Sequence, residues 1–167
     1  MSQVYLNGAF MAPEEARISP MDRGFLFADG IYEVVPAYNS VLFRFDEHLE
    51  RLERSLREVG IRNPHDRQQW QVLCEELIER NGGGNLSVYL QITRGAATKR
   101  DHAFPEPPVA ATVFMMTSPI AVPAADSPDT ASGGKAITRD DTRWARCDIK
   151  SISLLPNRLL RQQAVSA

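Results

Sequence analysis

The sequence predicts a domain of the α+β class, in which strands and helices occupy separate stretches of the chain. Three observations lead to this prediction. Residues 86–93 alternate apolar and polar side chains, which is typical of a strand with one buried face. Residues 46–59 carry leucines at helical spacing. Residues 39–40, Asn-Ser, separate two β-branched and aromatic runs, which favours a hairpin.

The first part of the chain should form strands. Short strands are expected within residues 4–18, and a longer one from Ile31 to Tyr38, paired with a strand from Val41 to Phe45. Side chains alternate along a strand, so Tyr32 and Val34 should share one face. Further turns are expected at Asp22-Arg23-Gly24 and Asp29-Gly30.

Two amphipathic helices are predicted next. The first spans Asp46 to Val59, with Asp46 as its N-cap. The second should begin at Asn63-Pro64, with proline in the first helical position, and end at Asn81-Gly82. Its expected buried stripe consists of Trp70, Leu73, Leu77 and Ile78.

The second half of the chain is expected to cross a domain boundary. Residues 109–116 are almost entirely apolar and predict a strand buried on both faces, after a long polar loop of a kind that is often functional. A composition rich in Pro, Ala, Ser and Asp predicts a linker at residues 118–134, between a first domain at 1–117 and the start of a second at 135–167. In that second part, strands are expected at 135–138 and 147–152, and a helix from Leu154 to Val165.

Composition and charge argue against several classes of protein. The net charge is -2 without a basic block, so no nucleic-acid partner is expected. No apolar run approaches membrane-spanning length, and Cys74 and Cys147 show neither metal-type spacing nor a disulfide framework. We therefore expect a cytoplasmic protein without a metal site, a nucleic-acid partner or a membrane partner.

Lysine is scarce in this sequence. The chain has 16 arginines and three lysines, at positions 99, 135 and 150. Unlike arginine, a lysine can lose its proton and act as a nucleophile. Lys150 lies between Ile149 and Ile152, so on a strand its amine would be partly desolvated. Taken alone, such a lysine is more often an edge residue whose amine reaches solvent.

The segment around Lys150 resembles the lysine region of the class IV aminotransferases. It reads Arg-Cys-Asp-Ile-Lys-Ser over residues 146–151, followed by a leucine pair and a predicted helix. Four further segments stand in the family's order and spacing: Asp22-Arg23-Gly24, residues 29–35, residues 47–52 and Thr93-Arg94-Gly95. The resemblance covers nearly the full chain and is greatest to the members that act on D-amino acids.

This resemblance implies both a fold and an activity. The fold would be the N-terminal domain of a fold type IV aminotransferase, an antiparallel sheet with two helices, followed by the beginning of a second, α/β barrel-like domain. The activity would move the amino group of a D-amino acid, such as D-alanine, to a 2-oxo acid. Pyridoxal 5′-phosphate would be held on Lys150 as a Schiff base. Alternatives are a branched-chain aminotransferase, an aminodeoxychorismate lyase, or a truncated, non-catalytic dimerisation module.

The resemblance also assigns roles to individual residues. Arg51 corresponds to the arginine that contacts the cofactor phosphate, and a fixed guanidinium suits a pair of phosphate oxygens. Without the resemblance, Arg51 would be interpreted as a solvated helix charge paired with Glu47. His48 is expected to be a packing or hydrogen-bonding residue of the same helix.

Substrate binding is expected to involve both a strand and the long loop. Tyr32, Arg100 and His102 correspond to the residues that trap the substrate α-carboxylate, and Val34 shares the strand face of Tyr32. By themselves Arg100 and His102 would be interpreted as part of an exposed polar loop. In the family this loop reaches into the neighbouring subunit's site, which implies a homodimer. In this sequence, the loop has one residue more between Gly95 and Arg100 than the corresponding loop of the family.

Members of the family continue past the last residue of this sequence. Their further part supplies the glutamate that pairs with the pyridine nitrogen and most of the phosphate-binding loops. We therefore expect residues 1–167 alone to bind the cofactor weakly. We also expect them to associate through the leucines of the last helix.

Overall fold

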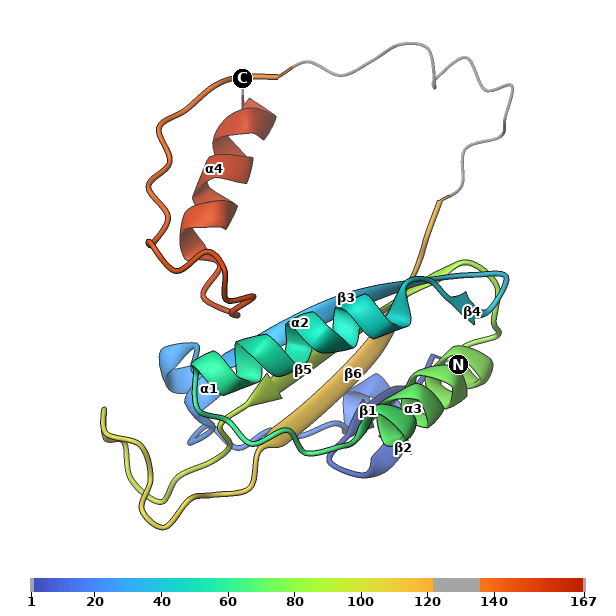
Figure 1. The fold of residues 1–167 in the computed structure, drawn as a ribbon, viewed down its shortest axis with the longest axis horizontal. Coiled ribbons are helices and arrows are strands. Elements are labelled where there is room, and N and C mark those ends of the chain that lie inside the picture. Colours follow the sequence, from blue (N-terminus) through green and yellow to red (C-terminus); the bar gives the residue numbers. More distant parts are fainter. Residues whose placement is uncertain (1, 122–135, 167) are drawn as a thin grey trace. The chain divides into compact units, whose positions relative to one another are not determined.

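The computed structural model describes residues 2–121 and 136–166 (Figure 1). Its contacts define two units, and each is described by itself. The first contains Met1–Ile120 and Asp148–Ser153, and the second contains Ala121–Cys147 and Leu154–Ala167. Residues 148–153, expected in the second domain, thus belong to the first unit. Most of the expected linker lies outside the described residues, so the domain boundaries stay a prediction.

A six-stranded sheet organises the first unit, in the order β2-β1-β6-β5-β3-β4, with every neighbouring pair antiparallel. The expected α+β class with an antiparallel sheet is therefore confirmed. Its strands are β1 Val4–Leu6, β2 Ala9–Met11, β3 Gly30–Tyr38, β4 Val41–Leu42, β5 Leu86–Thr93 and β6 Thr112–Pro119.

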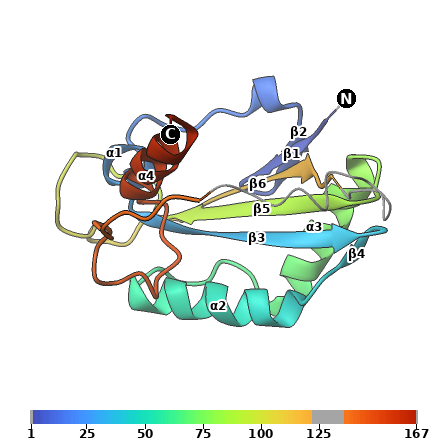
Figure 2. The same cartoon turned by 90° about the horizontal axis from the view of Figure 1, so that it is seen from above.

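Two long helices pack on the sheet. Helix α2 (Phe45–Glu58) contacts β3, and α3 (Arg67–Arg80) contacts β5 and β6 (Figure 2). Every second side chain of β3, beginning with Ile31, is buried, whereas Tyr32 and Val34 are half-buried, as expected for the opposite face. The core joins these layers through Ile31, Val35, Leu52, Leu56, Trp70, Leu77, Val88 and Ile92.

The predicted start of the second long helix is wrong. Helix α3 begins at Arg67, and its N-cap is Asp66, whose side chain accepts a hydrogen bond from the backbone N–H of Gln69. The Gln69 side chain accepts in return from the backbone N–H of Asp66, at 2.9 Å. This reciprocal capping box satisfies two donors at once, whereas a proline at the first position satisfies none. Of the expected stripe, all but the half-buried Leu73 are fully buried.

Three other expectations near turns and strands need correction. The strand expected at residues 41–45 ends at Leu42, because Arg44 adopts a left-handed conformation (φ 51°) and Phe45 begins α2. Residues 22–24 do not form a simple turn but start helix α1 (Arg23–Phe27), capped by Asp22. Strand β6 runs three residues later than expected, and Met116 on its outer face is exposed, so the strand is buried on one face only.

The strand expected at residues 147–152 is reduced to a single bridge between Ile31 and Ser151. The expected strand at 135–138 is absent over residues 136–138, and Lys135 lies outside the described residues. In the second unit, the expected helix is confirmed as α4 (Leu155–Ser166). No helix within residues 2–121 and 136–166 is long and apolar enough to cross a membrane.

Candidate functional site

Lys150 is held against the beginning of β3. Strand β4 pairs with β3 only at Ala37 and Tyr38, so this edge of β3 is open at its first residues. The backbone N–H of Tyr32 donates to the Lys150 carbonyl at 3.0 Å, and Ile152 N–H donates to the Gly30 carbonyl at 3.1 Å. The segment around Lys150 is therefore attached to this edge of the sheet by an isolated bridge.

The Lys150 side chain lies over an aromatic pair. Its Nζ atom is 3.8 Å from the centroid of the Tyr32 ring, and that ring stacks on Tyr89 with centroids 5.6 Å apart. The Tyr89 hydroxyl donates to Gln91 Oε1 at 2.7 Å, and burial, then the neighbouring Tyr32, raise the pKa of Tyr89. Val34 lies opposite Tyr89 in the strand register. A half-buried amine thus borders a surface formed by two phenols.

Directly next to Tyr32, Glu33 is fully buried and holds Arg51. Arg51 donates from Nε to Glu33 Oε1 at 2.6 Å and from Nη2 to Glu33 Oε2 at 2.8 Å. His48 Nδ1 lies 2.9 Å from the same Oε2 atom. The hydrogen bonds with Glu33 raise the pKa of Arg51. Pairing of Arg51 with Glu47, the alternative interpretation, is wrong, since Glu47 binds Arg44.

Arg51 keeps part of its guanidinium available. Its side chain is 41% exposed, and Nη1 has no hydrogen-bond partner among the described residues. Arg51 and Lys150 approach β3 at neighbouring residues, Glu33 and Tyr32. The structure therefore brings an amine, an aromatic surface and a partly free guanidinium to one end of one strand.

The other two predicted substrate residues lie elsewhere in this chain. The Arg100 guanidinium lies 4.7 Å from the centroid of the Phe27 ring. The centroid of the His102 ring lies 5.3 Å from the same Phe27 centroid. Both side chains are exposed, and within the described residues their ring and cation contacts are with α1 and not with Tyr32. The structure brings both Arg100 and His102 to Phe27 and gives neither a contact with Lys150 among the described residues.

Sequence reasoning assigned no role to a second charged cluster. Asp29 accepts hydrogen bonds from Arg23 Nε at 2.8 Å and from Arg94 Nε and Nη2 at 2.8 and 3.0 Å. Burial opposes ionisation of Asp29, but the hydrogen bonds from Arg94 and Arg23 outweigh it and lower the pKa of this carboxyl. All three residues lie in segments that carried the family resemblance, which was the available signal.

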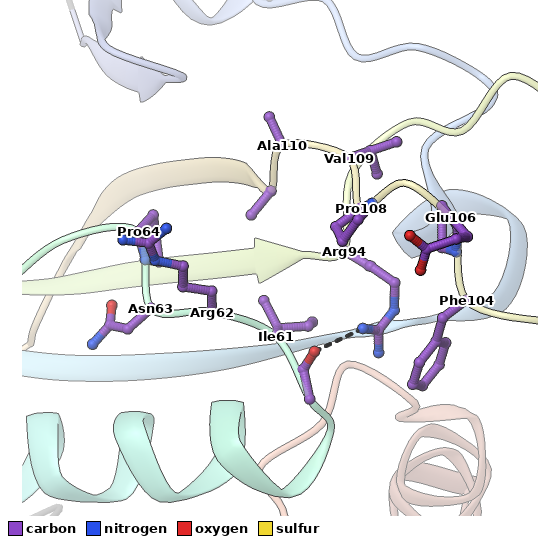
Figure 3. A pocket seen from close by; sticks show the side chains of 13 residues that line it. Ile61, Arg62, Asn63, Pro64, Arg94, Phe104, Glu106, Pro108, Val109 and Ala110 are labelled. Atoms are coloured by element: carbon purple, nitrogen blue, oxygen red, sulfur yellow. Dashed lines mark hydrogen bonds between the residues drawn. The ribbon is translucent and has the colours of Figure 1, made fainter.

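A cavity of about 830 Å³ lies beside this cluster, between the loop after α2 and the long loop before β6 (Figure 3). Arg94 forms part of its wall, donates from Nη1 to the Gly60 carbonyl at 3.0 Å, and stacks on Phe104 at 3.5 Å. Neither Lys150 nor Arg51 lines this cavity, so it is separate from the site at β3. Within the described residues, no group of three His, Cys, Asp or Glu side chains is placed to hold a metal ion.

Known proteins resemble this chain in sequence. D-alanine aminotransferase of Staphylococcus epidermidis (strain ATCC 35984) is 41% identical over 99% of this chain and 57% of its own length. D-alanine aminotransferase of Listeria monocytogenes (strain 10403S) is 36% identical over 97% of this chain and 55% of its own length. The chain thus spans little more than half the length of these curated relatives.

Solved structures share the fold. Escherichia coli branched-chain amino acid aminotransferase superposes with a TM-score of 0.65 at 19% identity, over 71% of this chain and 40% of that one. The branched-chain aminotransferase of Thermoproteus uzoniensis gives a TM-score of 0.61 at 22% identity, over 72% and 41%. The expected fold type IV architecture is confirmed. Because the model of the amino-transferase class IV family also matches residues 30–167, this chain belongs to that family.

Proposed function

We propose that this chain is part of a pyridoxal-phosphate-dependent transaminase that moves the amino group of a D-amino acid, such as D-alanine, to a 2-oxo acid. One observation carries the proposal: the Lys150 amine lies 3.8 Å from the Tyr32 ring centroid, and the buried carboxylate of the next strand residue, Glu33, anchors Arg51. The D-alanine aminotransferases, 36–41% identical to this chain, support the choice of substrate.

The donor set at β3 fits pyridoxal 5′-phosphate. The cofactor combines an aldehyde, a flat aromatic ring and a phosphate dianion. Lys150 provides the amine that would bond to the aldehyde carbon, Tyr32 an aromatic neighbour, and Arg51 Nη1 a charged donor for a phosphate oxygen. When bound, this cofactor withdraws electrons from the α-carbon of the substrate.

The residues of the chain would then share the remaining work. Lys150 Nζ would be the group that accepts the α-proton of the substrate and carries it. Glu33 fixes the orientation of Arg51 through two hydrogen bonds. Tyr32 and Val34 would border the substrate on the open face of the sheet.

Arg100 and His102 would bind the substrate carboxylate in a second copy of the chain. Two observations support this arrangement: both side chains are exposed, and both contact Phe27 rather than Tyr32. A homodimer would bring this pair to the Tyr32 of its partner. A cytoplasmic location is part of the proposal, since a reducing compartment keeps the free thiols of Cys74 and Cys147 reduced.

A branched-chain aminotransferase, another member of the family, is the second candidate; solved branched-chain aminotransferases share the fold of this chain. The two candidates differ in substrate handedness. The protein at its natural length should transfer the amino group of D-alanine to 2-oxoglutarate much faster than that of L-alanine or L-leucine. A preference for L-leucine would establish the second candidate instead.

The role of Lys150 has its own test. Borohydride reduction of the protein with cofactor, followed by peptide mapping, should label Lys150. Lys150→Ala should lower kcat by at least about 10³-fold, since it removes both the covalent attachment and the proton carrier. A label on Lys99 or Lys135 would contradict the assignment, and an inactive parent protein without a label would favour the non-catalytic dimerisation module.

A further inference from the structure

We propose that Arg23 is a positioning residue for the loop that contains Arg100 and His102. By binding the backbone of residues 101–103, it holds these two side chains in the position in which they would bind the substrate carboxylate. The inference rests on the proposed function, because it takes these two side chains as the carboxylate ligands. It adds a residue on a different element, helix α1, that would not touch the substrate itself.

The guanidinium of Arg23 holds the backbone of the loop directly. Its Nη1 atom donates to the carbonyls of Asp101 at 2.6 Å and Ala103 at 3.2 Å, and its Nη2 atom donates to the His102 carbonyl at 3.3 Å. Three consecutive carbonyls around His102 thus converge on one planar group. Only arginine has enough donors in a fixed plane for this arrangement; the lysine ammonium is a compact point charge.

The other side of Arg23 is tied to the body of the first unit. Its Nε atom donates to Asp29, which precedes β3, and Asp29 is held in turn by Arg94, which follows β5. Arg94 Nη2 also donates to the Val59 carbonyl at 2.7 Å, where α2 ends. The Arg23 side chain is only 4% exposed. The loop is therefore anchored to the ends of two strands and a helix.

Helix α1 also contacts the side chains of the loop. The ring of Phe27, one turn after Arg23, meets the guanidinium groups of Arg23 and Arg100, at 4.8 and 4.7 Å from its centroid, and the His102 ring. One short helix thus holds the backbone of residues 101–103 and contacts the two side chains proposed to bind the substrate carboxylate. Holding a long loop in its binding conformation reduces the ordering cost of ligand binding.

Kinetics of Arg23 variants in the protein at its natural length test this inference. Arg23→Lys and Arg23→Met should raise KM for D-alanine and for the 2-oxo acid by about tenfold or more, because the carboxylate pair is no longer held in place. The kcat value should change less than about threefold, and the cofactor absorption spectrum should not change. Arg57→Met, at an exposed position of α2, is the matched control and should behave as the parent.

Hydrogen exchange provides a readout that does not depend on catalysis. In Arg23→Met, the backbone amide of Ala103, which donates to Asp101 Oδ1 at 3.2 Å in the parent, should exchange at least about tenfold faster, while the amides of β5 keep the protection of the parent. If Arg23→Met does not fold, Arg23→Lys supplies the same comparison. Unchanged exchange at the Ala103 amide would overturn the inference, whatever the protein catalyses.

The combined outcomes separate the two proposals. Faster exchange with unchanged KM values, or loss of kcat together with the cofactor, would show that Arg23 does not position the carboxylate ligands. A parent protein that exchanges normally but transaminates no D-amino acid would refute the proposed function instead. In that case, faster exchange in the loop of Arg23→Met would still show that Arg23 holds the backbone of residues 101–103.

Discussion

Two carboxylates at the same end of the sheet, the fully buried Glu33 and the half-buried Asp29, hold arginines in different ways. Glu33 binds Arg51, whose side chain is 41% exposed and whose Nη1 has no hydrogen-bond partner among the described residues. Asp29 binds Arg23 and Arg94, which are 4% and 10% exposed and donate their remaining bonds to backbone carbonyls. The same pairing thus leaves a guanidinium partly free at one place and holds loops together at the other.

Burial explains why the two clusters should respond differently to mutation. An enclosed charge that loses its partner has no water to replace it, whereas a half-exposed one is partly solvated again. The Asp29 cluster should therefore dominate stability, and the Glu33 cluster should dominate cofactor binding. Four predictions follow this contrast from the largest effect to the smallest.

Asp29→Ala should have the largest effect. It leaves Arg23 and Arg94 buried without their carboxylate, which should lower the free energy of unfolding by about 3–5 kcal/mol. Urea unfolding followed by far-UV circular dichroism measures the loss. Asp46→Ala is the control: its pair with Arg67 is exposed on both sides, and its removal should cost less than about 1 kcal/mol. If both variants lose the same free energy of unfolding, enclosure of the Asp29 cluster does not make it more important for stability than an exposed ion pair.

Arg51→Lys should mainly weaken cofactor binding. The lysine keeps a positive charge but loses the second donor arm, and a lost charged hydrogen bond of about 1.5–3 kcal/mol corresponds to roughly ten- to a hundredfold in Kd for pyridoxal phosphate. Absorbance titration measures this constant. Arg57→Lys, on the exposed side of the same helix, should bind as the parent does. An unchanged Kd in Arg51→Lys would exclude the phosphate role.

Glu33→Gln should cost less than loss of Asp29, about 1–2 kcal/mol of stability, because the amide oxygen still accepts one hydrogen bond and Arg51 can reach water. Cofactor affinity should fall along with stability, since the orientation of Arg51 loosens. The two effects are measured by urea unfolding and by titration with pyridoxal phosphate. If Glu33→Gln lowers the free energy of unfolding as much as Asp29→Ala does, solvation of the exposed part of Arg51 does not compensate for the lost carboxylate.

The smallest expected effect is the contribution of Asp29 to the loss of stability at low pH. Because the pKa of Asp29 is lowered in the folded protein, its contribution to stability is complete above its unfolded pKa of about 3.9 and is lost as pH falls through the folded value. Urea midpoints between pH 7 and pH 3 should therefore fall less steeply in Asp29→Asn than in the parent. Parallel curves would contradict this contribution.

Local patterns in the sequence located most elements of the first unit. Strand β5 was predicted at its exact bounds, Leu86–Thr93, because alternation is a property of the residues themselves. The leucine spacing predicts helix α2 to within one residue at each end, because this pattern is also carried by the residues themselves. The start of α3 is not where proline placement predicts it, although the sequence holds the signal: Asp66 is followed three residues later by Gln69, the spacing of a capping box.

The sequence by itself determined the fold class and the family, because alternation, helical spacing and short motifs are all carried by residues close together along the chain; it also predicts Lys150 as the cofactor lysine. Only the tertiary structure decided what the arginines do. Asp29 and Arg94 are 65 positions apart, and Arg23 meets its carbonyl acceptors 78 to 80 positions later. No local pattern encodes such pairs: the sheet brings them together, and burial then decides whether a guanidinium holds backbone or remains open to a ligand.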